Sequence, residues 1–220
     1  SSLNLEKYDE WKDDPDMIGD VMRFLDNVLT DFINKAPEQF RDAKYSAERE
    51  RSVGLGVMGF HSFLQKKRIP LESVMAKSWN KKIFKQIDEQ VNQASKDLAE
   101  ERGACPDAAE YGFKERFSNK TAIAPTASIS IICGGASPGV EPIAANSYTH
   151  KTLSGSFNVR NRYLEEILES HGKNDDETWS TITTNQGSVS HLDFLTDLEK
   201  DVFKTAFELN QKWIIELSGD

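Results

Sequence analysis

Apolar residues recur at helical spacing along much of the chain. A broad apolar stripe begins after residues 14–16 and stops before Pro37, which predicts a helix between them. The longest periodic segment covers residues 71–102 and is followed by Gly103, a residue type that commonly ends helices. We interpret the charged residues of this second segment as its solvated face.

The C-terminal part combines helical and β-branched patterns. Residues 158–171 are predicted to form a helix, and the β-branched residues 178–184 a short strand. A last helix is predicted to start at Thr196 and to turn the following apolar residues inward: Val202, Phe203, Ala206, Phe207, Leu209, Trp213, Ile214 and Leu217. With a strand-like alternation at Leu3 and Leu5, these patterns predict a mainly helical chain.

Residues 121–142, TAIAPTASISIICGGASPGVEP, differ from this background because they contain no Lys or Arg. Residues 121–124 are predicted to form a buried strand that Pro125 ends. Two conformations are open for the residues after Pro125. Either Thr126 or Ser128 caps a short helix whose free N–H groups point at an anion such as phosphate, or the segment is a strand, a turn and a second strand.

The end of the same stretch is rich in glycine. Gly134, Gly135 and Gly139 predict a turn with unusual backbone angles. Glu141 leaves this turn, either as a supporting polar group or as a paired structural carboxylate. A lone carboxylate with no His or second acid in its motif is a weak candidate for general acid–base catalysis, so we expect no catalytic residue here.

A second glycine motif lies earlier in the chain. Gly54, Gly56 and Gly59 fit G-x-G-x-x-G, but the preceding residues ERERS are not the hydrophobic strand that a dinucleotide fingerprint requires. We therefore interpret the motif as a close-packed turn from a strand to a helix. His61, just beyond it, is interpreted as a helix-surface or core histidine, not as a base or ligand.

Composition restricts the classes of function. A net charge of −9 argues against a general nucleic-acid-binding surface, and no apolar run approaches the roughly 20 residues that span a membrane. Cys105 and Cys133 lack CxxC spacing, and the N-terminus carries no secretory signal, so we expect reduced thiols, no metal site and a cytoplasmic protein. Lys114 and Arg116 are the basic residues that could assist an anion near the central stretch. The start in mid-pattern, without Met, suggests a piece of a larger protein.

Several segments, in order along the chain, resemble a known family. They are RSVGLGVMGF at residues 51–60, ERGACP at 101–106, IAPTASISIICGGASPGVEPI at 123–143 and NSYTHKTLSGSFNVRN at 146–161, followed by the closing FKTAFELNQKWIIELSGD. The chain is similar to the large, catalytic subunit of ribonucleotide reductase, class I type. The resemblance implies an α/β fold, a helix-rich part of the ten-stranded barrel, with residues 1–220 forming a single partial domain from the C-terminal part of that barrel.

The resemblance also implies a function and a site. The family reduces ribonucleoside diphosphates to 2′-deoxyribonucleoside diphosphates by a thiyl-radical mechanism. The segment that matches its substrate phosphate-binding residues is Pro125, Thr126, Ala127, Ser128 and Ile129, with Ser130 and Glu141 as possible supporting residues. This role agrees with the anion site inferred from the residues themselves.

The resemblance implies partners and cofactors outside the segment. The segment should bind no cofactor; the parent enzyme takes a radical from a metal-containing small subunit and electrons from an external thiol reductant. The family's radical and redox cysteines match neither Cys105 nor Cys133, so this part alone should be inactive without the remainder of the large subunit. Two alternatives stay open: an adenosylcobalamin-dependent reductase, which shares the central motif, and a non-catalytic helical interaction module.

Overall fold

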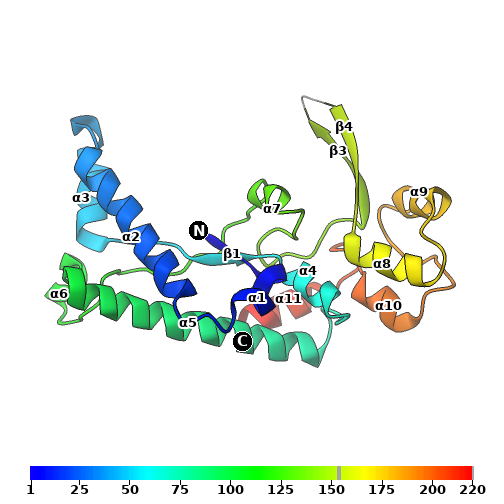
Figure 1. Ribbon diagram of the computed structural model, residues 1–220, viewed down its shortest axis with the longest axis horizontal. Helices are drawn as coiled ribbons and strands as arrows, with labels where there is room; N and C mark the ends of the chain where they lie inside the picture. Colours follow the sequence, from blue (N-terminus) through cyan, green and yellow to red (C-terminus); the bar gives the residue numbers. More distant parts are fainter. Residues whose placement is uncertain (153–154, 220) are drawn as a thin grey trace. The chain divides into compact units, whose positions relative to one another are not determined.

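Helices provide most of the regular structure in the described residues, 1–152 and 155–219, of this computed structural model (Figure 1). The chain divides into two units, each with its own contacts. Unit 1 comprises Ser1–Val57 and Lys82–Ala124, and unit 2 comprises Met58–Lys81 and Pro125–Asp220.

Unit 1 is built mainly from helices. Its elements are β1 (Ser2–Asn4), the 3-10 turn Leu5–Lys7, α1 (Tyr8–Trp11), α2 (Met17–Lys35), the 3-10 turn Glu38–Phe40, α3 (Arg41–Glu50), α6 (Pro106–Glu110), most of β2 (Gly56–Met58) and most of α5 (Val74–Arg102). Strand β1 pairs with β2. The strand-like start of the chain is therefore confirmed, although it is only three residues long.

The two helices predicted from periodicity are confirmed. Helix α2 buries Ile18, Met22 and Ile33 and ends before Pro37, which has no N–H to continue the helix. Helix α5 ends at Arg102, and Gly103 follows with φ +88°, a left-handed conformation that glycine adopts readily.

The glycines of the G-x-G-x-x-G motif form a packed turn, as interpreted. A Cβ at Gly54 would lie 2.9 Å from the Ala122 side chain, and one at Gly56 would lie 2.1 Å from the Ala122 carbonyl oxygen. Gly59, with φ +80°, precedes helix α4 (Phe60–Lys66). The glycines thus permit close approach of two backbones and a sharp entry into a helix.

Unit 2 contains α4, α7 (Ile129–Ile132), β3 (Ser147–Thr152), β4 (Gly155–Arg160), α8 (Arg162–Ser170), α9 (Asp176–Thr184), α10 (Asp197–Val202) and α11 (Gln211–Gly219). One apolar cluster joins its C-terminal helices: Tyr163, Leu164, Leu168, Trp179, Ile182, Val189, Leu192, Leu195, Val202 and Phe203. This cluster forms a hydrophobic core for residues that follow the central stretch.

A hairpin precedes α8, and its last residues overlap the start of the predicted helix over 158–171. Strands β3 and β4 pair antiparallel, from Ser147 opposite Arg160 to Thr152 opposite Gly155. The predicted helix over 158–171 consequently starts at Arg162, where the Asn161 side chain caps the N–H of Tyr163. Residues 158–160 belong to the second strand.

The strand predicted at residues 178–184 is wrong, because this segment is helix α9. The Asp175 side chain accepts a hydrogen bond from the N–H of Thr178 at 2.7 Å and caps the helix. Trp179 and Ile182, three positions apart, are buried on one helical face. Capping and burial of this face outweigh the modest preference of threonine and isoleucine for strands.

The predicted last helix is two helices. Thr196 starts α10 with a capping box to Glu199, as expected, but the helix ends at Val202. The Glu208 carboxylate then accepts from the N–H and hydroxyl of Thr205 and stabilises a turn. Because of this break Phe207, predicted to face inward, is 84% exposed.

Candidate functional site

Residues 121–124 lead into the central stretch without forming the predicted buried strand. They are exposed, and among the described residues their β-pairing is limited to one isolated parallel bridge between Leu55 and Thr121. The segment is held by backbone hydrogen bonds to Leu55, whose N–H donates to the Lys120 carbonyl at 3.0 Å and whose carbonyl accepts from the N–H of Ala122 at 3.1 Å. Gly54 and Gly56 permit this close approach to Ala122.

Of the two conformations open for the central stretch, the structure has the short helix and not the second strand. Helix α7 starts after Ser128, and the N–H of Ile132 donates to the Ser128 carbonyl at 3.2 Å. Neither predicted cap operates through its side chain: Ser128 makes no capping hydrogen bond, and the Thr126 hydroxyl bonds elsewhere.

Thr126 lies in a constrained conformation beneath this helix. Its φ is +53°, its side chain is buried, and its Oγ1 accepts a hydrogen bond from the N–H of Gly139 at 2.7 Å. Its carbonyl accepts from the N–H of Ser130 at 2.9 Å. Thr126 therefore connects the start of the central stretch to its glycine-rich end.

The residues after Thr126 present polar backbone groups to solvent. Ala127, Ser128 and Ile129 are exposed, and their N–H groups form no hydrogen bond with any described residue. Successive N–H groups beside a left-handed residue can form a small concavity that binds an anion. The Ser128 hydroxyl is exposed next to them and can donate a further hydrogen bond.

The two supporting candidates differ in position. Ser130 is buried, and its hydroxyl donates to the Ala127 carbonyl at 3.5 Å. Glu141 is exposed and makes no ion pair within the described part of the chain, so the structure does not support the alternative of a paired structural carboxylate. Gly134, Gly135 and Gly139 have φ of +98°, +80° and +50°, as the predicted turn requires.

His61 is a core histidine. Burial lowers its pKa to about 4, so the ring is neutral at physiological pH. Its Nδ1 accepts a hydrogen bond from the N–H of Ile143 at 3.1 Å, just after the glycine turn. The structure thus gives His61 a contact with the central stretch that sequence reasoning did not predict.

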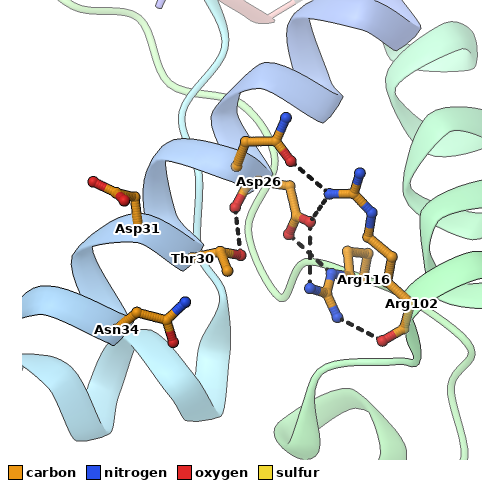
Figure 2. Close-up of a pocket in the computed structure, with 7 residues that line it drawn as sticks. Asp26, Thr30, Asp31, Asn34, Arg102 and Arg116 are labelled. Carbon is orange, nitrogen blue, oxygen red and sulfur yellow. Dashed lines mark hydrogen bonds and ion pairs between the residues drawn. The ribbon is translucent and has the colours of Figure 1, made fainter.

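Arg116, proposed as a helper for the anion, belongs to a different site. Its guanidinium, with those of Arg51 and Arg102, binds the fully buried carboxylate of Asp26 at N–O distances of 2.7–3.3 Å. Asp26 lies at the wall of a pocket of about 380 Å³. Figure 2 shows the guanidinium groups of Arg102 and Arg116 directed at its carboxylate. Arg116 therefore pairs with Asp26 and is not part of the central stretch's site. Lys114, the other predicted helper, is exposed.

Burial opposes ionisation of Asp26, but hydrogen bonds from Arg116, Arg102 and Arg51 outweigh it and hold the pKa of this carboxyl below its usual value. The other polar residues of the pocket wall are Asn27, Thr30, Asp31 and Asn34, all on α2. Each buried polar group at the cluster has a hydrogen-bond partner, which is the arrangement of a structural ion network.

The two cysteines of the chain lie in different environments. Cys105 is buried and Cys133 exposed, and both are free thiols. Within residues 1–152 and 155–219, no group of three or more His, Cys, Asp or Glu side chains is placed to hold a metal ion. The described residues include no helix that is both long and apolar enough to cross a bilayer.

Comparisons with known proteins give one consistent result. The model of the ribonucleotide reductase barrel domain matches residues 1–115 and 107–220. The ribonucleoside-diphosphate reductase large subunit of Invertebrate iridescent virus 6 is 50% identical over all of this chain, which spans 23% of that relative.

A solved structure confirms the predicted fold class. The Actinobacillus ureae class Id ribonucleotide reductase alpha subunit matches 99% of this chain with a TM-score of 0.90 and 39% identity, and the match covers 40% of that subunit. A vitamin B12-dependent ribonucleoside-diphosphate reductase from Thermoplasma acidophilum is 34% identical over 96% of this chain, which spans 28% of that relative.

Proposed function

Because this chain belongs to the ribonucleotide reductase family and matches its barrel domain from residue 1 to residue 220, we propose that it works as part of a large subunit that reduces ribonucleoside diphosphates. In this role residues 125–129 hold the phosphates of the substrate. The products are 2′-deoxyribonucleoside diphosphates, formed by thiyl-radical chemistry in the remainder of the subunit.

The observation that carries the site is the backbone of residues 126–129. Thr126 adopts a left-handed conformation, and the N–H groups of Ala127, Ser128 and Ile129 have no protein acceptor among the described residues. A diphosphate supplies acceptor oxygens for these donors and for the exposed Ser128 hydroxyl. Pro125 and Thr126 act mainly through conformation, since the Thr126 oxygen already accepts from Gly139.

The chemistry assigned to this chain is binding and orientation of the substrate. Neither thiol has a second cysteine as a redox partner, and the described residues offer no metal site. The radical would come from a metal-containing small subunit and the electrons from an external thiol reductant, both acting through other parts of the large subunit. We place the assembled protein in the cytoplasm.

The substitution Ser128→Ala, made in the complete large subunit, tests the phosphate site. Loss of one charge-assisted hydrogen bond of roughly 1.5–3 kcal/mol should raise the KM for a ribonucleoside diphosphate about tenfold or more. Ser170→Ala is the matched control, because Ser170 is exposed and its hydroxyl bonds only within α8. An unchanged KM and kcat in the Ser128 variant would refute the phosphate assignment.

The similarity to the vitamin B12-dependent enzyme supports a second candidate, a reductase that uses adenosylcobalamin. The two candidates share the proposed phosphate site and differ in the source of the radical. Activity of the complete large subunit with added adenosylcobalamin and without a small subunit would favour the second candidate.

A further inference from the structure

The glycine-rich end of the central stretch is fastened to the start of α4. The N–H of Gly59 donates to the Ser137 carbonyl at 2.8 Å. Ser62 and Ser137 then form a reciprocal pair: the N–H of Ser62 donates to Ser137 Oγ at 3.2 Å, and the N–H of Ser137 donates to Ser62 Oγ at 2.8 Å. Both serines are buried, so water cannot replace either bond at low cost.

The same turn is hydrogen-bonded to the proposed phosphate site through Gly139 and Thr126. The N–H of Gly139, two positions after Ser137, donates to Thr126 Oγ1 at 2.7 Å. Thr126 has φ +53°, a conformation that is unfavourable for a β-branched residue and persists only where its surroundings fix it. On the far side of the turn, His61 accepts from the N–H of Ile143.

These contacts make a continuous connection from α4 to the exposed N–H groups at residues 127–129. We propose that Ser62 is a positioning residue for substrate phosphate binding, acting through Ser137 and the Gly139–Thr126 hydrogen bond. This inference rests on the proposed function of residues 125–129. Ser62 touches no atom of that segment in the described contacts, so its effect on the substrate is indirect.

The connection predicts which part of the substrate will be affected. Removing the Ser62 hydroxyl leaves the buried N–H of Ser137 without its acceptor, which frees the turn and with it the constraint on Thr126. The N–H groups of residues 127–129 must then be ordered when the ligand binds, which weakens binding. The loss should concern the phosphates and leave the nucleoside contacts intact.

The test compares CDP with cytidine, which lacks the phosphates, on the complete large subunit. For Ser62→Ala we expect a five- to tenfold weaker affinity for CDP, an unchanged affinity for cytidine, and a raised KM with kcat retained. Ser137→Ala should have a similar effect, and the double variant should lose no more than about the larger single loss, since the two residues form one unit. Ser170→Ala serves again as the control.

The outcomes separate this inference from the proposed function. If Ser128→Ala weakens CDP binding and Ser62→Ala does not, or if Ser62→Ala weakens CDP and cytidine equally, the positioning role is wrong and the phosphate site stands. If Ser128→Ala has no effect on CDP, the proposed function itself fails.

A second pair of variants covers the case in which Ser62→Ala does not fold. Thr126→Val keeps the shape of the side chain but removes the acceptor for Gly139, whereas Thr126→Ser keeps the acceptor. Weaker CDP binding in the valine variant with near-normal binding in the serine variant supports the connection. Normal binding in both variants overturns it.

Discussion

At the scale of single residues, Asp26 shows how one buried charge organises its surroundings. Three guanidinium groups from α5, from the segment after α6 and from the end of α3 converge on its carboxylate. Figure 2 shows the first two of them, Arg102 and Arg116. Arg51 reaches it from a left-handed backbone, φ +45°, at the position after α3 where glycine is usually preferred. The ion pair between the Arg51 side chain and Asp26 therefore outweighs the strain of this backbone conformation.

Asp26→Asn should therefore destabilise the protein by roughly 3–5 kcal/mol, because it leaves buried arginines without their counter-charge. Urea unfolding measures the change. Asp31→Asn is the control: Asp31 lies on the same helix but is exposed, and among the described residues its one ion pair is with Lys35. Its loss should lower the free energy of unfolding by less than about 1 kcal/mol. Equal effects of the two substitutions would contradict the role given to Asp26.

His61 predicts a second effect at this scale, on the pH dependence of stability. Its pKa falls from 6.5 to about 4 in the folded state, so below pH 6.5 the unfolded state binds a proton that the folded state does not. The contribution of neutral His61 to the free energy of unfolding is complete above pH 6.5. It falls by about 3 kcal/mol in total as the pH falls toward 4. His61→Gln does not titrate and should show a flatter decline in the free energy of unfolding over this range. Parallel pH profiles would show that His61 is not responsible.

At the scale of elements, the turn that precedes α4 depends on backbones that touch. Gly56→Ala would place a methyl group 2.1 Å from the carbonyl oxygen of Ala122, so we expect a loss of at least roughly 1–3 kcal/mol in stability. Gly19→Ala is the opposite case, since Gly19 is inside α2 with no atom within 4 Å of the added group. It should stabilise the protein by about 0.5–1 kcal/mol. Thermal unfolding of both variants checks the pair, and a neutral Gly56→Ala would argue against the close packing.

The elements also show what periodicity can and cannot predict. Helices α2 and α5 were predictable because each has a long apolar face and a clear stop at Pro37 or Gly103. Residues 178–184 were not, since the decisive contacts are a cap from Asp175 and burial against distant helices. The hairpin at residues 147–160 was missed because its alternation of apolar and polar residues is short: β4 alternates only at Phe157 and Val159, and β3 offers Tyr148 as its one large apolar residue.

The candidate site, too, could be predicted from the sequence only in part. Its location in residues 125–129 was predictable from hydroxyl residues, glycines and the family resemblance. The inward orientation of Thr126 was not, because it depends on Gly139, 13 positions later, and on a backbone angle that the sequence pattern does not indicate. Ser62 was beyond prediction altogether, since a contact over 75 positions has no local signal.

At the scale of the whole molecule, the chain consists of two units of different construction. Unit 1 combines an apolar core with the ion network at Asp26, while unit 2 combines its apolar cluster with the hydrogen-bonded connection from Ser62 to Thr126. The proposed phosphate site lies entirely in unit 2. That residues 1–220 behave as a single partial domain of a barrel stays a prediction.

The pairing of β3 with β4 has a consequence for the behaviour of the protein in solution. In the part of the chain that the structure describes, these two strands form a sheet by themselves, and each therefore has one edge of backbone N–H and C=O groups without a strand partner. Such an edge can template a strand from another molecule. We therefore expect the protein to be easiest to keep monomeric when it is dilute or when another strand occupies one of these edges.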